Sequence, residues 1–232
     1  MRMGLIIALV CTLFLQGCSS ENRISSQNEG GKATTMDQQL LQAADRKDAS
    51  ALEKLIKDGA NINAQDSKGR TAAMIATYNN DIASAKVILE AGADVNIQDE
   101  MKNTPFLYAG AEGNLEILKL TIAAGADPTI TNRYNGTALI PASEHGYTDV
   151  VQELLTNTKI DVNHVNRLGW TALMEAIVLN NGNANQQETV RLLIEHGADV
   201  NLPDEEGVTP LKHARQRGFD QIVQLLVQAG AK

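Results

Sequence analysis

A repeat of 33 to 38 residues runs through most of this chain. A threonine opens each unit, and an alanine follows five residues later. The threonines are Thr71, Thr104, Thr137, Thr171 and Thr209. The alanines are Ala76, Ala109, Ala142, Ala176 and Ala214. A chain that repeats in this way folds as a stack of similar units, each burying its apolar face against its neighbours.

Composition supports many small units over one large core. Hydrophobic residues make up 43% of the 232 residues, but aromatic residues only 3%. The core must therefore be filled by Ala, Leu, Ile and Val spread along the chain. The net charge is −8, and no run of five like charges occurs. This charge pattern disfavours nucleic acids and anionic lipid surfaces as partners.

A second set of landmarks marks the end of each unit. A Gly-Ala pair closes an apolar run at Gly59-Ala60, Gly92-Ala93, Gly125-Ala126, Gly197-Ala198 and Gly230-Ala231. Threonine is a good N-cap, and glycine after a helix supplies a left-handed C-cap. The pattern predicts two helices in each unit. Asp66, Asp99 or Asp204 can stabilise the turn that follows.

These landmarks resemble the ankyrin repeat. The resemblance is clearest in TPFLYA at 104–109 and TPLKHA at 209–214, and in GADVN at 92–96 and 197–201. It covers residues 36–232 and implies an all-α repeat solenoid, in which each repeat is a helix-turn-helix plus a β-hairpin or loop. The six repeats are expected at about 38–70, 71–103, 104–136, 137–170, 171–208 and 209–232, with the first and last as caps.

Two departures from the pattern predict local irregularities. Thr158 stands where glycine closes the other units, and an extra residue enters near 159–160, so that helix end should be looser. The fifth unit is longer by four or five residues, within the polar segment 180–187. That segment is either a tolerated insertion or a contact surface for a partner.

The residues before the repeats have a different character. A short positive head precedes an almost wholly apolar run at 4–15, which is typical of a secretory signal. Twelve apolar residues rise about 18 Å as a helix. The hydrocarbon core of a bilayer is about 30 Å thick. A secretory signal is therefore favoured over a membrane-spanning helix.

The apolar run ends in Leu-Gln-Gly-Cys at 15–18, which resembles the bacterial lipobox. The resemblance implies a lipoprotein signal peptide at 1–17, acylation of Cys18, and a flexible tether at 18–35. The alternative is a plain signal peptide with an incidental cysteine. Ser19 after the cysteine is similar to Gram-negative lipoproteins of the outer membrane. We therefore expect a lipid-anchored envelope protein that faces the periplasm, with the cell surface as the other possibility.

The chain lacks the common catalytic and metal-binding motifs. Its histidines are His145, His164, His196 and His213. None has the His-Glu-x-x-His spacing of a zinc site, and the glycines fall at repeat ends and not in a phosphate loop. No Gly-x-Ser-x-Gly elbow occurs. We expect no enzyme activity, no catalytic residue, no metal and no cofactor.

What remains is a surface for a protein partner. In the ankyrin family, the hairpin tips and the exposed ends of the first helices line a concave face. Mapped onto this chain, the predicted partner-binding residues are Tyr78, Met101, Arg133, Tyr134, His145, Arg167, Leu168, Trp170, Leu179, Glu205 and Glu206. Tyr, Trp and Arg are typical of interface centres. The alternative for Trp170 is that it packs against its own hairpin and does not contact a partner. The alternative for Glu205 and Glu206 is that they are solvated and contact no partner.

The resemblance also limits the function classes. A lipid-anchored ankyrin protein outside the cytoplasm is similar to immunity proteins that neutralise periplasm-acting toxins such as phospholipase effectors. It is also similar to accessory scaffolds that support an envelope stress or antioxidant enzyme. Both classes bind a protein on the concave face, and the immunity reading is preferred. The sequence does not name the partner.

Overall fold

The computed structural model describes residues 35–232, which form twelve α-helices. The predicted signal peptide, Cys18 and the tether up to residue 34 lie outside the described residues. The helices are α1 (Thr35–Asp45), α2 (Ala49–Lys57), α3 (Ala72–Tyr78), α4 (Ile82–Glu90), α5 (Pro105–Ala111), α6 (Leu115–Ala123), α7 (Leu139–His145), α8 (Thr148–Asn157), α9 (Ala172–Val178), α10 (Ala184–Glu195), α11 (Pro210–Arg217) and α12 (Asp220–Gln228).

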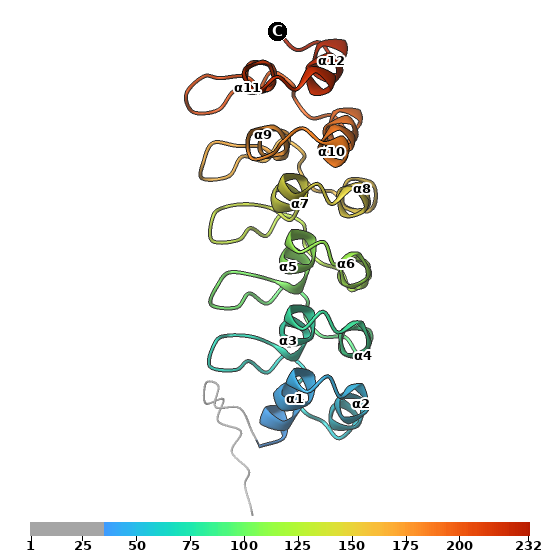
Figure 1. Cartoon of the computed structure of the whole chain (residues 1–232). Helices are drawn as coiled ribbons and strands as arrows, with labels where there is room; N and C mark the ends of the chain where they lie inside the picture. Colours follow the sequence, from blue (N-terminus) through green and yellow to red (C-terminus); the bar gives the residue numbers. More distant parts are fainter. Residues whose placement is uncertain (1–34) are drawn as a thin grey trace, which may run out of the picture. The chain divides into compact units, whose positions relative to one another are not determined.

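Within this part of the chain, the helices stack as six antiparallel pairs (Figure 1). The odd-numbered helices form an inner layer, and the even-numbered helices form an outer layer. A long loop, here called a finger, projects beside the inner layer before each of α3, α5, α7, α9 and α11. The described fingers contain one isolated β-bridge, between Gln65 and Thr71, and no regular strand. The all-α repeat fold is confirmed, with fingers that are loops.

Threonine caps the inner helices as predicted, with one exception. The side chains of Thr71, Thr104, Thr171 and Thr209 each accept a hydrogen bond from the backbone N–H three residues later, over 3.1 to 3.4 Å. Thr137 makes no such cap, and its buried hydroxyl has no partner in the described structure. The prediction is wrong at this position because the fourth residue after Thr137 is Pro141, which has no N–H. The Ile140 N–H bonds the Thr137 carbonyl over 3.3 Å, so it is not free for the hydroxyl.

The predicted glycine C-caps are confirmed on five outer helices. The glycines have φ between +83° and +94°, and each donates its N–H to the carbonyl three residues earlier. At α8, where no glycine is present, Thr158 takes over the closing role. Its hydroxyl donates to the Leu154 carbonyl over 2.6 Å and accepts the Ile160 N–H over 3.1 Å. The end of α8 is therefore bonded and not loose.

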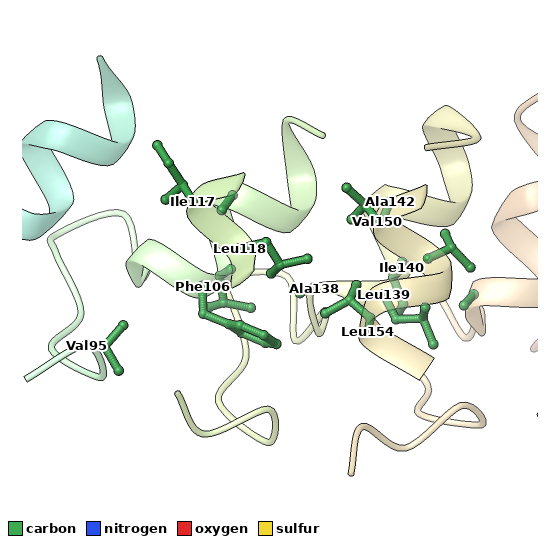
Figure 2. Close-up of a cluster of buried hydrophobic side chains, with 14 of the residues drawn as sticks. Val95, Phe106, Ile117, Leu118, Ala138, Leu139, Ile140, Ala142, Val150 and Leu154 are labelled. Carbon is green, nitrogen blue, oxygen red and sulfur yellow. The ribbon is translucent and has the colours of Figure 1, made fainter. Parts of the chain in front are cut away.

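The core is a continuous apolar layer between the inner and outer helices. The repeated alanines at 76, 109, 142, 176 and 214 are fully buried, which lets neighbouring inner helices pack closely. Figure 2 shows the central part, in which Phe106 lies with Ile117 and Leu118. No helix among the described residues is long and apolar enough to cross a bilayer.

The long polar segment of the fifth repeat packs against the fourth. Asn183 caps α10 by accepting the Gln186 N–H over 3.2 Å. The side-chain amides of Asn180 and Gln186 both donate to the Glu144 carbonyl, over 2.7 and 2.9 Å. The segment therefore has a structural role: it closes the end of α7.

Candidate partner-binding surface

The five fingers share one turn geometry, built on an aspartate or asparagine. These residues are Asp66, Asp99, Asn132, Asn166 and Asp204. Each side chain accepts the backbone N–H groups two and four residues later, over 2.8 to 3.1 Å. The third residue after each has φ between +59° and +74°. The same positions in different fingers are therefore structurally equivalent.

This equivalence aligns the residues at the finger tips. The second position after each aspartate or asparagine holds Lys68, Met101, Tyr134, Leu168 and Glu206. The three central side chains are 45%, 57% and 59% exposed, in that order. Large apolar side chains thus stand in solvent on three consecutive fingers, with a charge at either end. We call Met101, Tyr134 and Leu168 the fingertip row.

The Arg133 side chain and one backbone hydrogen bond link the members of the fingertip row. The guanidinium carbon of Arg133 lies 4.8 Å from the centre of the Tyr134 ring, and its Nη1 lies 3.6 Å from the Met101 sulfur. The backbone N–H of Arg167 donates to the backbone carbonyl of Tyr134 over 3.0 Å. Within the described residues, neither arginine forms an ion pair. Two unneutralised cations therefore lie beside the apolar tips.

Trp170 does not stand at a tip. It is half-buried at the base of its finger. Its backbone N–H donates to Asn166 Oδ1 over 3.1 Å, and its backbone carbonyl accepts the backbone N–H of Asn166 over 3.0 Å. The sequence placed Trp170 with Tyr134 and Leu168, but the finger geometry separates it from the fingertip row.

Other predicted site residues lie at three separate places. Tyr78 is half-buried on the inner layer, whereas Glu205 and Glu206 are exposed on the last finger. His145 and Leu179 are exposed at the C-terminal ends of α7 and α9. The fingers lead into the opposite, N-terminal ends of these helices. The His145 ring lies 5.3 Å from the ring of Tyr147. The part of His145 and Leu179 in partner binding stays a prediction.

Tyr78 anchors the second finger. Its hydroxyl donates to Asp99 Oδ2 over 2.5 Å and accepts from Asn103 Nδ2 over 3.1 Å. Its ring meets the Tyr108 ring edge-on, with centres 4.4 Å apart. Burial raises the pKa of Tyr78 to about 12, and the nearby carboxylate of Asp99 adds to the shift. Tyr78 and Met101 also line a hollow of about 440 Å³ between the first two fingers.

The sequence analysis did not predict a carboxyl pair beneath the fourth finger, in which Glu175 is buried and Glu144 is half-buried. Glu175 on α9 is 5% exposed and accepts from Asn166 Nδ2 over 2.6 Å. Burial and the adjacent Glu144 carboxylate raise the pKa of Glu175 to about 7. The repeat spacing could have predicted this position. Glu175 is four residues after Thr171, on the inner-helix face that holds Tyr108 and His213 in other repeats.

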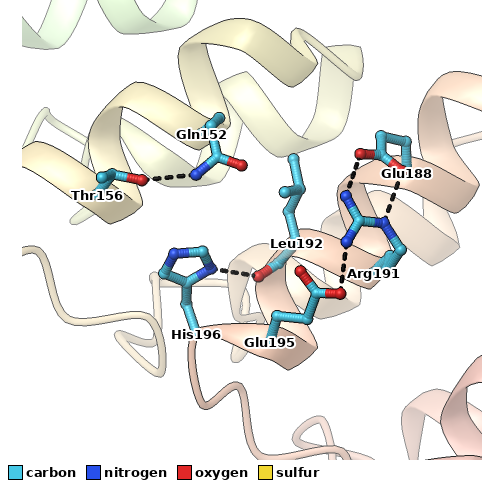
Figure 3. Close-up of polar contacts among 7 residues, drawn as sticks. All are labelled: Gln152, Thr156, Glu188, Arg191, Leu192, Glu195 and His196. Carbon is cyan, nitrogen blue, oxygen red and sulfur yellow. Dashed lines mark hydrogen bonds and ion pairs between the residues drawn. The ribbon is translucent and has the colours of Figure 1, made fainter.

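The remaining histidines make structural contacts. His196 Nδ1 lies 2.8 Å from the Leu192 carbonyl on the outer layer, near the ion pairs of Arg191 with Glu188 and Glu195 (Figure 3). His213 Nε2 lies 2.7 Å from Asp204 Oδ2, and His164 Nε2 lies 2.7 Å from the Asn135 carbonyl. The described residues contain no group of three or more metal-ligating side chains.

Comparison with known proteins identifies the repeats. A family model described as ankyrin repeats (3 copies) matches residues 40–132, 106–204 and 181–232. This chain belongs to the ankyrin-repeat family. A solved ankyrin repeat domain from Acinetobacter baumannii is 50% identical, with a TM-score of 0.81, covering 83% of this chain and 98% of that one. A second solved ankyrin repeat protein is 39% identical with the same TM-score, covering 84% and 99%.

Curated ankyrin proteins match over shorter stretches. Ankyrin repeat protein YahD of Escherichia coli is 56% identical over 86 residues, which are 37% of this chain and 43% of YahD. Protein phosphatase 1 regulatory subunit 27 of Mus musculus is 33% identical over 86 residues, which are 37% of this chain and 53% of that protein. This chain thus spans about half the length of these relatives. Ankyrin repeats are protein-binding modules, and no catalytic family is indicated.

Proposed function

We propose that this chain is a lipid-anchored protein of the bacterial envelope that binds and blocks a toxin acting in the periplasm, such as a phospholipase effector. The observation that carries the binding part is the fingertip row. Three large apolar side chains stand in solvent beside two arginines that have no ion-pair partner in the described residues. Aromatic, Met and Arg side chains are enriched in interface cores.

The location part of the proposal is supported by the N-terminal sequence. Gly17-Cys18 follows an apolar run and precedes a polar stretch of about the length of a tether. Acyl chains on a cysteine contribute about 0.8 kcal/mol per buried methylene, so several of them anchor a protein stably. An anchored binding module placed at the membrane would meet a phospholipase near its substrate.

The inhibitory part is supported by a relative. The mouse protein that shares 33% identity over 86 residues is named a regulatory subunit of a phosphatase. Ankyrin repeats of this kind therefore occur in a protein named for the control of an enzyme. We extend that role to this chain as a proposal, with the enzyme being the toxin.

A protection assay tests the proposal. Cells that lack this gene should be sensitive to the product of a neighbouring toxin gene, and the wild-type chain should restore growth. The double variant Tyr134→Ala with Leu168→Ala should fail to protect at normal abundance. Its affinity for the purified toxin should fall at least tenfold, because two exposed anchors are removed without disturbing the core.

The matched control removes apolar side chains of similar exposure from the outer layer. Ile82 and Val227 are 46% and 48% exposed on α4 and α12. The Ile82→Ala, Val227→Ala chain should protect as well as the wild type. Full protection by the fingertip variant contradicts the proposal. If deletion instead lowers the activity of an envelope stress or antioxidant enzyme, the chain is an accessory scaffold.

A further inference from the structure

The stacking of the repeats sets the spacing that is expected between successive fingertips. Each repeat adds one inner helix and one finger to the stack (Figure 1), and packed helices lie about 8 to 10 Å apart. Seven residues of an α-helix rise about 10.5 Å and return to nearly the same face. Three residues of an extended strand span about 10 Å but end on the opposite face. A helix can therefore present one face to three consecutive tips.

The charges beside the tips define what such a helix must carry. Arg133 and Arg167 occupy equivalent positions, one residue before Tyr134 and Leu168. The preceding finger has Glu100 at that position. A complementary partner needs carboxylates beside its second and third apolar side chains.

The ends of the series give the complex a direction. Lys68 occupies the tip of the first finger, whereas Glu205 and Glu206 lie exposed on the last finger. A partner that carries acidic residues through its middle and a basic residue at one end would meet opposite charges when that end faces the last finger. The reversed orientation would place the basic residue near Lys68 and Glu100, whose charges offset each other, so it is less favourable than facing two glutamates.

We propose that the fingertip row binds an amphipathic helix of the partner protein, with apolar side chains at i, i+7 and i+14, carboxylates beside the last two, and a basic end toward Glu205 and Glu206. Three contacts require a partner helix of about 15 residues. This inference rests on the proposed function and adds the kind of partner. It differs from edge-strand addition because the described fingers contain no regular strand to extend.

A peptide selection on the full chain tests the inference. The probe is a displayed library of random 21-residue peptides, counter-selected on the Met101→Ala, Tyr134→Ala, Leu168→Ala variant. Sequences that depend on the tips should carry apolar residues seven apart with Asp or Glu beside the last two. A synthetic consensus peptide should gain helical circular dichroism on binding. It should bind at least tenfold more weakly to the Arg133→Glu, Arg167→Glu chain, because two attractive contacts become repulsive.

The controls separate the possible failures. Unchanged melting of the triple variant establishes that only the surface changed, and the Ile82→Ala, Val227→Ala chain should select the same peptides as the wild type. Tip-dependent peptides with alternating apolar residues overturn the helix inference but leave protein binding by the tips intact. Absence of any tip-dependent peptide overturns the inference, while the protection assay judges the proposed function independently.

Two further results would assign the fingertip row to another occupant. Tip-dependent binding to phosphatidylglycerol vesicles would make it a membrane contact. Concentration-dependent dimerisation that the triple variant abolishes would make it a contact between copies of this chain. Either result overturns the inference.

Discussion

At the scale of single residues, Glu175 is a glutamate that the fold buries almost completely. It has a raised pKa of about 7 because burial and the neighbouring Glu144 both oppose its ionisation. The pKa of glutamate in an unfolded chain is about 4.3, so the folded state binds the proton more tightly. The free energy of unfolding should therefore fall as pH rises from about 4.5 to 7, and level off above that range.

Glu175→Gln should remove this pH-dependent penalty. The glutamine oxygen can still accept from Asn166, and its amide can donate to Glu144. We expect the variant to be more stable than the wild type by about 1 to 3 kcal/mol at pH 8, with little difference at pH 4. Urea unfolding across this range measures the change. As a control, Glu112→Gln at an exposed position should leave the pH dependence of the free energy of unfolding unaltered. Equal stability of Glu175→Gln and wild type at pH 8 would show that ionising the buried carboxyl does not destabilise the fold.

At the scale of elements, an asparagine ladder links successive repeats. Asn63, Asn96, Asn163 and Asn201 each accept a backbone N–H from the following repeat, over 2.8 to 2.9 Å. Thr129 occupies the same place at the junction between the third and fourth repeats, and no corresponding bond to the Asp161 N–H occurs in the described structure. This junction thus lacks one of the bonds that the other junctions share.

Thr129→Asn should add the missing bond. The longer amide places an acceptor where the other asparagines have one, and a hydrogen bond of this kind contributes about 0.5 to 1.5 kcal/mol. The denaturant midpoint should rise accordingly. Asn96→Thr is the reciprocal control and should lower the midpoint by a similar amount. A Thr129→Asn chain no more stable than wild type, alongside a destabilised Asn96→Thr chain, would mean that the extra residue near 159–160 moves Asp161 out of reach.

At the scale of the whole molecule, the proposed lipid anchor decides where the repeats work. Only two cysteines occur, at 11 and 18, and both precede the described residues. Cys18→Ser should abolish labelling by radioactive palmitate and move the protein out of the detergent phase. Cys11→Ser should keep the label, since that residue lies inside the predicted signal peptide. Continued labelling of Cys18→Ser would contradict the lipobox reading.

The sequence alone determined the features that depend on local chemistry. The period, the helix pairs and the finger turns follow from threonine caps, closing glycines and aspartates, each of which acts within a few residues of the backbone. The ankyrin resemblance, and not local chemistry, placed Met101, Tyr134 and Leu168 at tip positions, together with Trp170.

The tertiary structure decided what depends on contacts between repeats. It placed Tyr78 against Asp99 and Glu175 beside Glu144. The members of these pairs are 21 and 31 residues apart in the sequence, so they meet only when the repeats stack. The physical reason is that burial and pKa depend on which side chains neighbouring repeats bring together, and a repeat pattern records the spacing of the units but not those pairings.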